Sequence, residues 1–287
     1  MTLAELVAHT TRQLDAAGLS YGHGTTNAHD EAAWLVLHAL GLPLDTDLLD
    51  DSASNRPVTP AQQAQAATLL KARIDTRKPL AYLINEAWLQ GLSFYVDERA
   101  IVPRSLIAEC ITDGSIDPWL SSQTRRVLDL CTGNGSLAVL AALAWPEVQV
   151  DAADLSADAL AVARINVDQH GLQDRITLIE SDGLAQCHGP YDLILCNPPY
   201  VNAASMAALP PEFRAEPALA LDGGVDGMGF VRALLRSAPP HMSANSVLVL
   251  EIGHERAHFE AAFPQLNPVW LDTSAGGDQV LLLPHER

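Results

Sequence analysis

The second half of the chain alternates short apolar runs with stretches of helical periodicity. Most of the early runs are apolar without interruption, which is typical of parallel strands that helices cover on both faces. Alternation of this kind predicts an α/β fold, with a doubly wound sheet of about seven strands. The predicted strands span residues 127–130, 148–153, 176–180, 193–196, 247–252, 269–271 and 280–283.

The fourth predicted strand runs directly into Asn197-Pro198-Pro199-Tyr200. Two adjacent prolines cannot donate to a sheet ladder, so the strand must stop there. In open α/β sheets ligands bind at this carboxyl edge. The Asn197 side-chain oxygen and the Pro198 carbonyl can each accept one N–H of a planar NH2 group, and the Tyr200 ring can stack on it. The tetrapeptide indicates methylation of an amide or amino nitrogen by a sulfonium cofactor; a Pro-rich turn is the structural alternative.

The composition narrows the class of partner. Lys and Arg total 17 against 35 Asp and Glu, a net charge of −18. Nucleic-acid binding relies on basic side chains at phosphates, so we expect no direct nucleic-acid binding. The acidity either serves solubility or attracts a basic protein partner.

No apolar stretch approaches the ~20 residues of a membrane span, and the first residues lack the features of a secretory signal. We therefore expect a cytoplasmic protein without membrane association. The four cysteines form no C-x-x-C pair, which argues against a zinc site and against a disulfide framework. We expect no metal.

The first ~85 residues have helical periodicity. Leu3, Leu6, Val7 and Leu14 share one helical face, and a second helix is predicted over 30–40. Thr59-Pro60 is an N-cap followed by proline at the first helical position, which predicts a helix to about residue 77. The polar segment 45–57 between these helices is predicted to be a loop. Residues 92–96 and 100–102 flank Asp97-Glu98-Arg99 and predict a β-hairpin.

The first strand of the second half enters a glycine turn, Asp129-Leu130-Cys131-Thr132-Gly133-Asn134-Gly135. Its glycines permit a tight turn and close approach of a ligand. The next strand ends at Asp154, 19 residues beyond Gly135, where a carboxylate can accept hydrogen bonds from both ribose hydroxyls of a nucleoside cofactor. Capping the following helix is the alternative role of Asp154. The third strand ends near Asp182, which either binds an adenine amine or is a turn acid.

The glycine turn is a poor match to the dinucleotide pattern G-x-G-x-x-G. It resembles motif one of the class I S-adenosylmethionine-dependent methyltransferases. With Asp154 and Asn197-Pro198-Pro199-Tyr200, after a helical N-terminal region, the chain resembles the protein N5-glutamine methyltransferases. One branch of that family acts on peptide-chain release factors, and another acts on large-subunit ribosomal protein L-three.

Several segments are similar to the ribosomal-protein branch. Two departures limit what carries over to the cofactor pocket: Cys131 stands where the release-factor branch usually has Gly, and Gly183 stands where that branch often has a bulky residue. Residues 223–227 match the Gly-Gly-x-Asp-Gly segment of the family as a whole. The segments that resemble the ribosomal branch are Tyr21-Gly22-His23-Gly24-Thr25, Tyr95-Val96-Asp97-Glu98-Arg99 and Val102-Pro103-Arg104-Ser105.

The resemblance implies a class I methyltransferase (Rossmann-like) fold in three parts. These are a helical substrate-recognition domain over 1–85, a β-hairpin linker over 86–115 and a cofactor-binding catalytic domain over 116–287. It implies methyl transfer from S-adenosylmethionine to the side-chain N5 of a glutamine in a basic protein, ribosomal protein L-three, with S-adenosylhomocysteine as product.

The resemblance also implies the site residues. Asn197, Pro198 and Tyr200 are expected to be catalytic. Pro199 and Arg104 join these three in binding the substrate, although Arg104 is alternatively paired with a nearby acid. The residues expected to bind the cofactor are Asp129, Cys131, Thr132, Gly133, Asn134, Gly135, Asp154, Leu155, Asp182, Gly183 and Asn197.

Other functions stay open at this point. A release-factor glutamine N5-methyltransferase is one alternative. An adenine-N6 DNA or RNA methyltransferase uses a similar Asn/Asp-Pro-Pro-aromatic tetrapeptide, but it must bind phosphates, and the acidic composition argues against that. A non-catalytic adaptor is a third alternative. Tyr21, His23 and His29 either face the protein substrate or serve packing.

Overall fold

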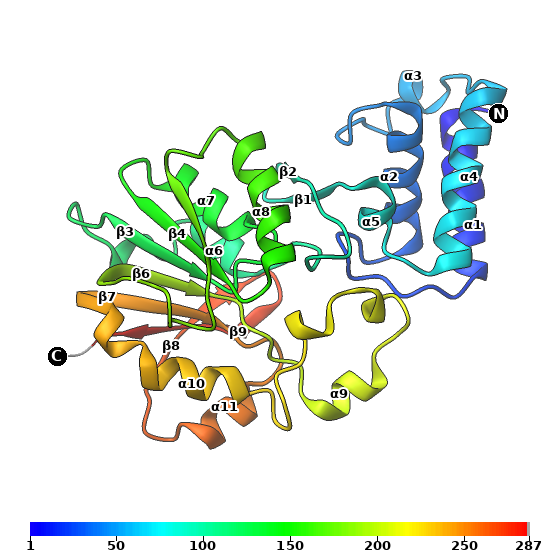
Figure 1. Cartoon of the computed structure of the whole chain (residues 1–287). Coiled ribbons are helices and arrows are strands. Elements are labelled where there is room, and N and C mark those ends of the chain that lie inside the picture. The colour runs from blue at the N-terminus through cyan, green and yellow to red at the C-terminus, as the bar shows by residue number, and fades with distance from the viewer. Residues whose placement is uncertain (286–287) are drawn as a thin grey trace. The chain divides into compact units, whose positions relative to one another are not determined.

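The computed structural model describes residues 1–285, and Figure 1 shows the course of the whole chain. The chain divides into two compact units. The first contains Met1–Glu86 and Leu209–Ala215, and the second contains Ala87–Ala208 and the residues from Glu216 onward. The three-domain division drawn from the sequence stays a prediction.

The first unit is helical, as its periodicity predicts. The helix expected over 30–40 begins two residues earlier, because Asn27 caps it by accepting the backbone N–H of Asp30. Thr59 caps the third long helix as predicted. The expectation of a loop over 45–57 is wrong in part, because Asp50 caps one short helical turn there. The helices are α1 (Leu3–Ala16), α2 (Ala28–Leu40), α3 (Asp51–Ser54), α4 (Pro60–Thr76) and α5 (Leu80–Ile84).

Ion pairs with buried carboxylates hold the first unit together. Arg73 Nε donates to Glu31 Oε1 at 2.8 Å, and these side chains are only 1% and 3% exposed. Glu212 is fully buried and forms an ion pair of 2.7 Å with Arg77 Nη2. A buried charge without a partner is strongly destabilising, so these pairs fix the segment Leu209–Ala215 within the unit.

The Tyr21-Gly22-His23 segment packs inside the same unit. The ring of His23 lies 4.2 Å from that of Phe213, centroid to centroid. A Cβ on Gly22 would lie 2.9 Å from Phe213 Cζ, so the contact requires glycine. Burial raises the pKa of Tyr21 to about 12. These contacts correspond to the packing role that the sequence left open for Tyr21 and His23.

The second unit is built on a sheet of seven strands, as predicted (Figure 1). The strand order is β5-β4-β3-β6-β7-β9-β8. The first five of these are parallel, and β9 is antiparallel to both of its neighbours. The strands are β3 (Arg126–Leu130), β4 (Gln149–Asp154), β5 (Ile176–Glu180), β6 (Tyr191–Cys196), β7 (Met242–Glu251), β8 (Val269–Thr273) and β9 (Gly276–Pro284).

Helices cover both faces of this sheet. One apolar cluster joins α6, α7 and part of α8 to one face, and a second joins α10 and α11 to the other. The sheet is therefore doubly wound, as expected. The α-helices are α6 (Ile107–Thr112), α7 (Ser136–Ala144), α8 (Ala157–Gln169), α9 (Ala203–Ala208), α10 (Gly229–Ser237) and α11 (Arg256–Ala262), with 3-10 turns η1 (Asp117–Trp119), η2 (Phe213–Ala215), η3 (Ala218–Ala220) and η4 (Pro239–His241).

The hairpin lies earlier than predicted. The strands that pair are β1 (Ala87–Leu89) and β2 (Leu92–Phe94). Gln90 and Gly91 join them with φ angles of 49° and 77°, the left-handed pair that a tight hairpin requires. Contrary to the expectation, Asp97-Glu98-Arg99 does not connect two paired strands. It forms a local turn in which Asp97 accepts the backbone N–H and the Nε–H of Arg99.

A single carboxyl group ties the end of β3 to the start of α7. Asp129 is fully buried, and its Oδ2 accepts the Thr132 hydroxyl at 2.5 Å and the Ala138 N–H at 3.0 Å. Its Oδ1 has no hydrogen-bond partner among residues 1–285. Burial raises the pKa of Asp129 to about 7. Between pH 4 and about 7 the Asp129 carboxyl group therefore stays protonated in the folded chain, whereas in the unfolded chain it is ionised.

This carboxyl group predicts a pH dependence of stability. An unfolded Asp loses its proton near pH 4, so between pH 4 and about 7 the folded chain binds the extra proton and its stability falls as pH rises. We expect the unfolding free energy of the wild type, minus that of Asp129→Asn, to fall by about 1.4 kcal/mol per pH unit within this window. Urea unfolding of both proteins at pH 5.0, 5.5 and 6.0 measures this difference, and a constant value would contradict it.

Candidate functional site

Four parallel strands of the second unit end at one cavity. The carboxyl ends of β3, β4, β5 and β6 are adjacent in the sheet, so the segments that follow them meet at this edge. The cavity collects predicted residues from all four segments. Those at its wall are Cys131, Gly133, Asp154, Leu155, Asp182, Gly183, Asn197 and Pro199.

Asp154 is held in place by backbone groups. Its Oδ2 accepts the Gly133 N–H at 2.8 Å, and its Oδ1 accepts the Ser156 N–H at 2.9 Å. Ser156 caps α8 with its own side chain, so the capping role considered for Asp154 belongs to Ser156. Burial raises the pKa of Asp154, and the three backbone hydrogen bonds it accepts oppose that shift. The glycine turn and the acid thus form one rigid element.

Helix α8 supports the glycine turn from behind. Gly135 has a φ of 81°, and a Cβ there would lie 3.1 Å from the Cβ of Ala163. The buried Asn166 donates to the Asn134 carbonyl at 2.8 Å and accepts the Tyr95 N–H at 2.7 Å. The sequence analysis missed Asn166. Its position on the apolar face of a predicted helix could have revealed it, because a buried amide needs hydrogen-bond partners.

Cys131 occupies an unusual backbone conformation. Its φ of 62° lies in the left-handed region, which costs a residue with a Cβ about 1–2 kcal/mol. Glycine, usual here in the release-factor branch, avoids that cost. The contact with Cys196, together with burial, raises the pKa of the Cys131 thiol well above its ordinary value. This thiol is therefore a poor nucleophile, and both cysteines are free.

Asn197 follows the last residue of β6 directly. It lines the cavity, and its side chain has no hydrogen-bond partner within the described part of the chain. Pro198 is buried. The Tyr200 hydroxyl donates to Glu251 Oε1 at 3.1 Å, and burial raises the pKa of Tyr200. The amide of Asn197 is thus available to a ligand, while the hydroxyl of Tyr200 is already engaged.

Arg104 does not line the cavity. Its guanidinium binds both oxygens of the buried Glu216, Nη1 to Oε1 at 2.6 Å and Nη2 to Oε2 at 2.7 Å. Glu216 Oε1 also accepts the Val102 N–H at 3.0 Å. This matches the alternative in which Arg104 pairs with an acid, and its binding of substrate stays a prediction. The other predicted residues outside the cavity wall are Asp129, Thr132, Asn134, Gly135, Pro198 and Tyr200.

Part of the cavity wall comes from residues that the sequence analysis did not assign to the site. Leu219 lines the cavity although its side chain is 56% exposed. A bridge between Val201 and Asp222 brings its segment back beside the tetrapeptide. Local sequence gives no signal for this contact, because it depends on chain that returns after many residues. The further wall residues are Arg99, Ala100, Ile101, Leu130, Ala153, Ser156, Ala159, Ser181, Pro217, Ala220 and Phe230.

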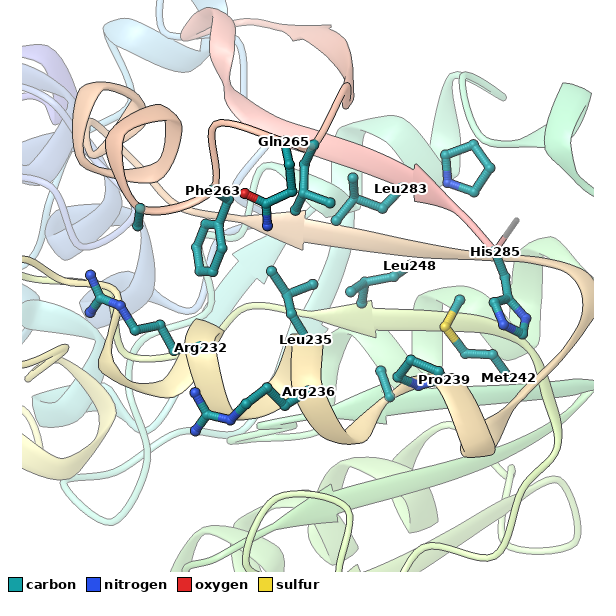
Figure 2. Close-up of a pocket in the computed structure, with 14 residues that line it drawn as sticks. Arg232, Leu235, Arg236, Pro239, Met242, Leu248, Phe263, Gln265, Leu283 and His285 are labelled. Carbon is teal, nitrogen blue, oxygen red and sulfur yellow. The ribbon is translucent and has the colours of Figure 1, made fainter. Parts of the chain in front are cut away.

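A second, larger cavity of about 520 Å³ lies elsewhere in the same unit. Figure 2 shows Arg232 and Arg236 on one side of it and apolar side chains such as Leu248 and Leu283 around it. It contains none of the residues predicted from the sequence. Among the described residues no cluster of His, Cys, Asp or Glu could hold a metal ion, and no helix is long and apolar enough to cross a membrane.

Comparisons with known proteins agree with this geometry. Residues 116–223 match the family described as Methyltransferase small domain, and residues 5–84 match the PrmC N-terminal domain. A solved structure, the hMettl16 catalytic domain in complex with MAT2A 3′UTR hairpin 6, has a TM-score of 0.55 at 15% identity, covering 79% of this chain and 82% of that one. At this identity the likeness shows the fold alone.

Two curated relatives are similar over almost their whole length. The ribosomal protein uL3 glutamine methyltransferase of Bordetella pertussis is 55% identical over 289 residues, covering 100% of this chain and 96% of the relative. The protein of the same name from Burkholderia pseudomallei is 49% identical over 292 residues, covering 98% and 94%. The resemblance and the fold class predicted from the sequence are both confirmed. The chain therefore belongs to the family of ribosomal protein uL3 glutamine methyltransferases.

Proposed function

We propose that this protein transfers a methyl group from S-adenosylmethionine to the side-chain N5 of a glutamine in ribosomal protein uL3. The observation that carries the proposal is the position of Asn197-Pro198-Pro199-Tyr200 at the end of β6, beside the cavity that Asp154 and Asp182 line. The names of the full-length relatives support the choice of uL3.

The residues of the cavity suit the cofactor. Its wall is mostly apolar with a few polar groups, as is usual for small-molecule sites. The Asp154 carboxylate would accept the ribose hydroxyls, Asp182 would accept the adenine amine, and Leu155 and Leu219 would pack on the purine. When bound, the cofactor supplies a methyl group activated by a sulfonium.

The glycine turn also holds two buried polar atoms without partners in the described residues. Asn134 Nδ2 is a donor, and Asp129 Oδ1 is an acceptor when its carboxyl group is ionised. An acceptor and a donor at one turn suit the ammonium and the carboxylate of the cofactor's methionyl group. The fully buried, partnerless atoms are costly in the protein alone, so binding that satisfies them would be favoured.

Methylation of an amide is difficult because the nitrogen lone pair is delocalised into the carbonyl. Asn197 Oδ1 and the Pro198 carbonyl would accept the two N–H groups of the substrate glutamine and hold its nitrogen ~3–3.5 Å from the methyl carbon. The same oxygens would stabilise the positive charge that grows on nitrogen. The amide nitrogen would bond to the methyl carbon while the electron pair of the C–S bond stays with the departing sulfur, and the methylated amide would release a proton to water.

The charge of the protein favours a basic substrate. With a net charge of −18, the protein attracts cationic partners over distance. Ribosomal proteins that bind rRNA phosphates carry basic side chains, so uL3 fits this requirement. We place the reaction in the cytoplasm, where ribosomal proteins are made and assembled.

The first test replaces the proposed amide acceptor. Asn197→Ala removes one of two oxygens that bind the substrate N–H groups, and loss of such an electrostatic contact costs about 100-fold or more in rate. We expect transfer of labelled methyl groups to purified uL3 to be nearly abolished, while calorimetry gives cofactor affinity close to that of the wild type. Asn267→Ala, the same change at an exposed position, is the control. Near-normal turnover of Asn197→Ala would contradict the mechanism.

The second test addresses cofactor binding. Asp154→Ala removes one or two charge-assisted hydrogen bonds to the ribose, worth about 1.5–3 kcal/mol each, so the dissociation constant for S-adenosylhomocysteine should rise at least tenfold. Asp154→Asn keeps an acceptor for the Gly133 N–H and separates loss of charge from collapse of the turn. The exposed Asp158→Asn is the control. An unchanged dissociation constant in both Asp154 variants would remove this role.

A further inference from the structure

Two glycines hold the backbone of Tyr200. A Cβ on Gly223 would lie 2.7 Å from Tyr200 Cα, and a Cβ on Gly227 would lie 2.3 Å from the Tyr200 carbonyl oxygen. Gly227 also has a φ of 76°, which disfavours any side chain. The Gly-Gly-x-Asp-Gly segment therefore serves as a close-fitting support for the residue that ends the tetrapeptide.

A third glycine and a carboxylate hold the ring of Tyr200. A Cβ on Gly253 would lie 2.5 Å from Tyr200 Cε2, so the ring packs directly on the backbone after β7. The Tyr200 hydroxyl donates to Glu251 Oε1 at 3.1 Å. Glu251 is the last residue of β7, and the pairing of Cys196 with Leu250 places it beside Asn197 across the two strands.

Glu251 is 3% exposed, and its two carboxylate oxygens bind different parts of the chain. Its Oε2 accepts the Ser105 hydroxyl at 2.6 Å and the Leu106 N–H at 2.9 Å, which anchors the start of α6. Its Oε1 serves Tyr200. A buried carboxylate is costly unless it is fully bonded, so the ring and the carboxylate constrain one another.

We propose that Glu251 is a positioning residue for methyl transfer, acting through the Tyr200 hydroxyl to set the position of the ring beside Asn197 and Pro198. The inference rests on the proposed function and deepens it. A tyrosine held at its backbone alone could still rotate about its side-chain torsions. The bond to Glu251 fixes the far end of the ring, and a fixed ring would hold still the tetrapeptide backbone that presents the Asn197 and Pro198 oxygens to the substrate amide.

A double-mutant cycle tests this inference, with uL3 as the substrate and labelled-methyl transfer as the assay. Tyr200→Phe keeps the ring and removes the hydroxyl. Glu251→Leu removes both acceptor oxygens at similar volume, whereas the NH2 group of a Gln variant could still donate to the Tyr200 hydroxyl. We expect each change to lower kcat about tenfold, because small errors in positioning are costly in rate. The double variant should lose no more than the worse single variant, since both changes break one bond.

Two further readouts separate positioning from a general loss of structure. The KM for uL3 and the dissociation constant for S-adenosylhomocysteine should change less than threefold in each variant. Ser105→Ala removes a hydrogen bond from Oε2 and leaves the bond between Oε1 and Tyr200, so it should keep kcat within about threefold of the wild type.

Three results would overturn the inference. Losses that multiply to about 100-fold in the double variant would show that Glu251 acts independently of Tyr200. A Ser105→Ala variant as slow as Glu251→Leu would show that Glu251 only anchors α6. If Glu251→Leu does not fold, Tyr200→Phe decides alone, and an unchanged kcat refutes the role of the hydroxyl. A wild type that fails to label uL3 removes the proposed function itself, and the inference with it.

Discussion

The parallel register of four strands is the constraint on which the rest of this structure depends. Leu130 pairs with Ala153 on one side and with Cys196 on the other, and Asp154 pairs with Glu180. These pairings align the carboxyl ends of the strands. Residues far apart in sequence, from the glycine turn to the tetrapeptide after β6, therefore reach one cavity without any long side chain bridging the distance. A shift of register in any of these strands would disperse the site.

Features that depend on local chemistry were predictable from the sequence. All seven strands of the large sheet were found from their apolar runs, and the end of β6 was found because proline cannot continue a ladder. Thr59 was recognised as a helix cap because threonine can accept a backbone N–H of the first turn and a proline follows it. The cavity residues that directly follow strands β3 to β6 were also within reach, because parallel topology alone brings them together.

Features that depend on distant contacts were not predictable. Both Gln90-Gly91 and Asp97-Glu98-Arg99 are polar enough to turn, and the choice between them rests on Gln90 adopting a left-handed φ that its side chain does not favour. Glu251 and Asn166 each bond to chain more than 30 residues away, so their neighbours in sequence say nothing of their partners. Leu219 reaches the cavity only because its segment folds back on residues after the tetrapeptide.

The segment Leu209–Ala215 has a consequence for how the protein can be divided. Because it belongs to the helical unit while its flanks belong to the other, the polypeptide passes between the units at three places in the sequence. Neither unit is a single uninterrupted stretch of chain. A fragment cut after Glu86 would leave Arg77 without Glu212 and His23 without the ring of Phe213. Removal of the whole helical unit therefore takes more than one cut in the polypeptide.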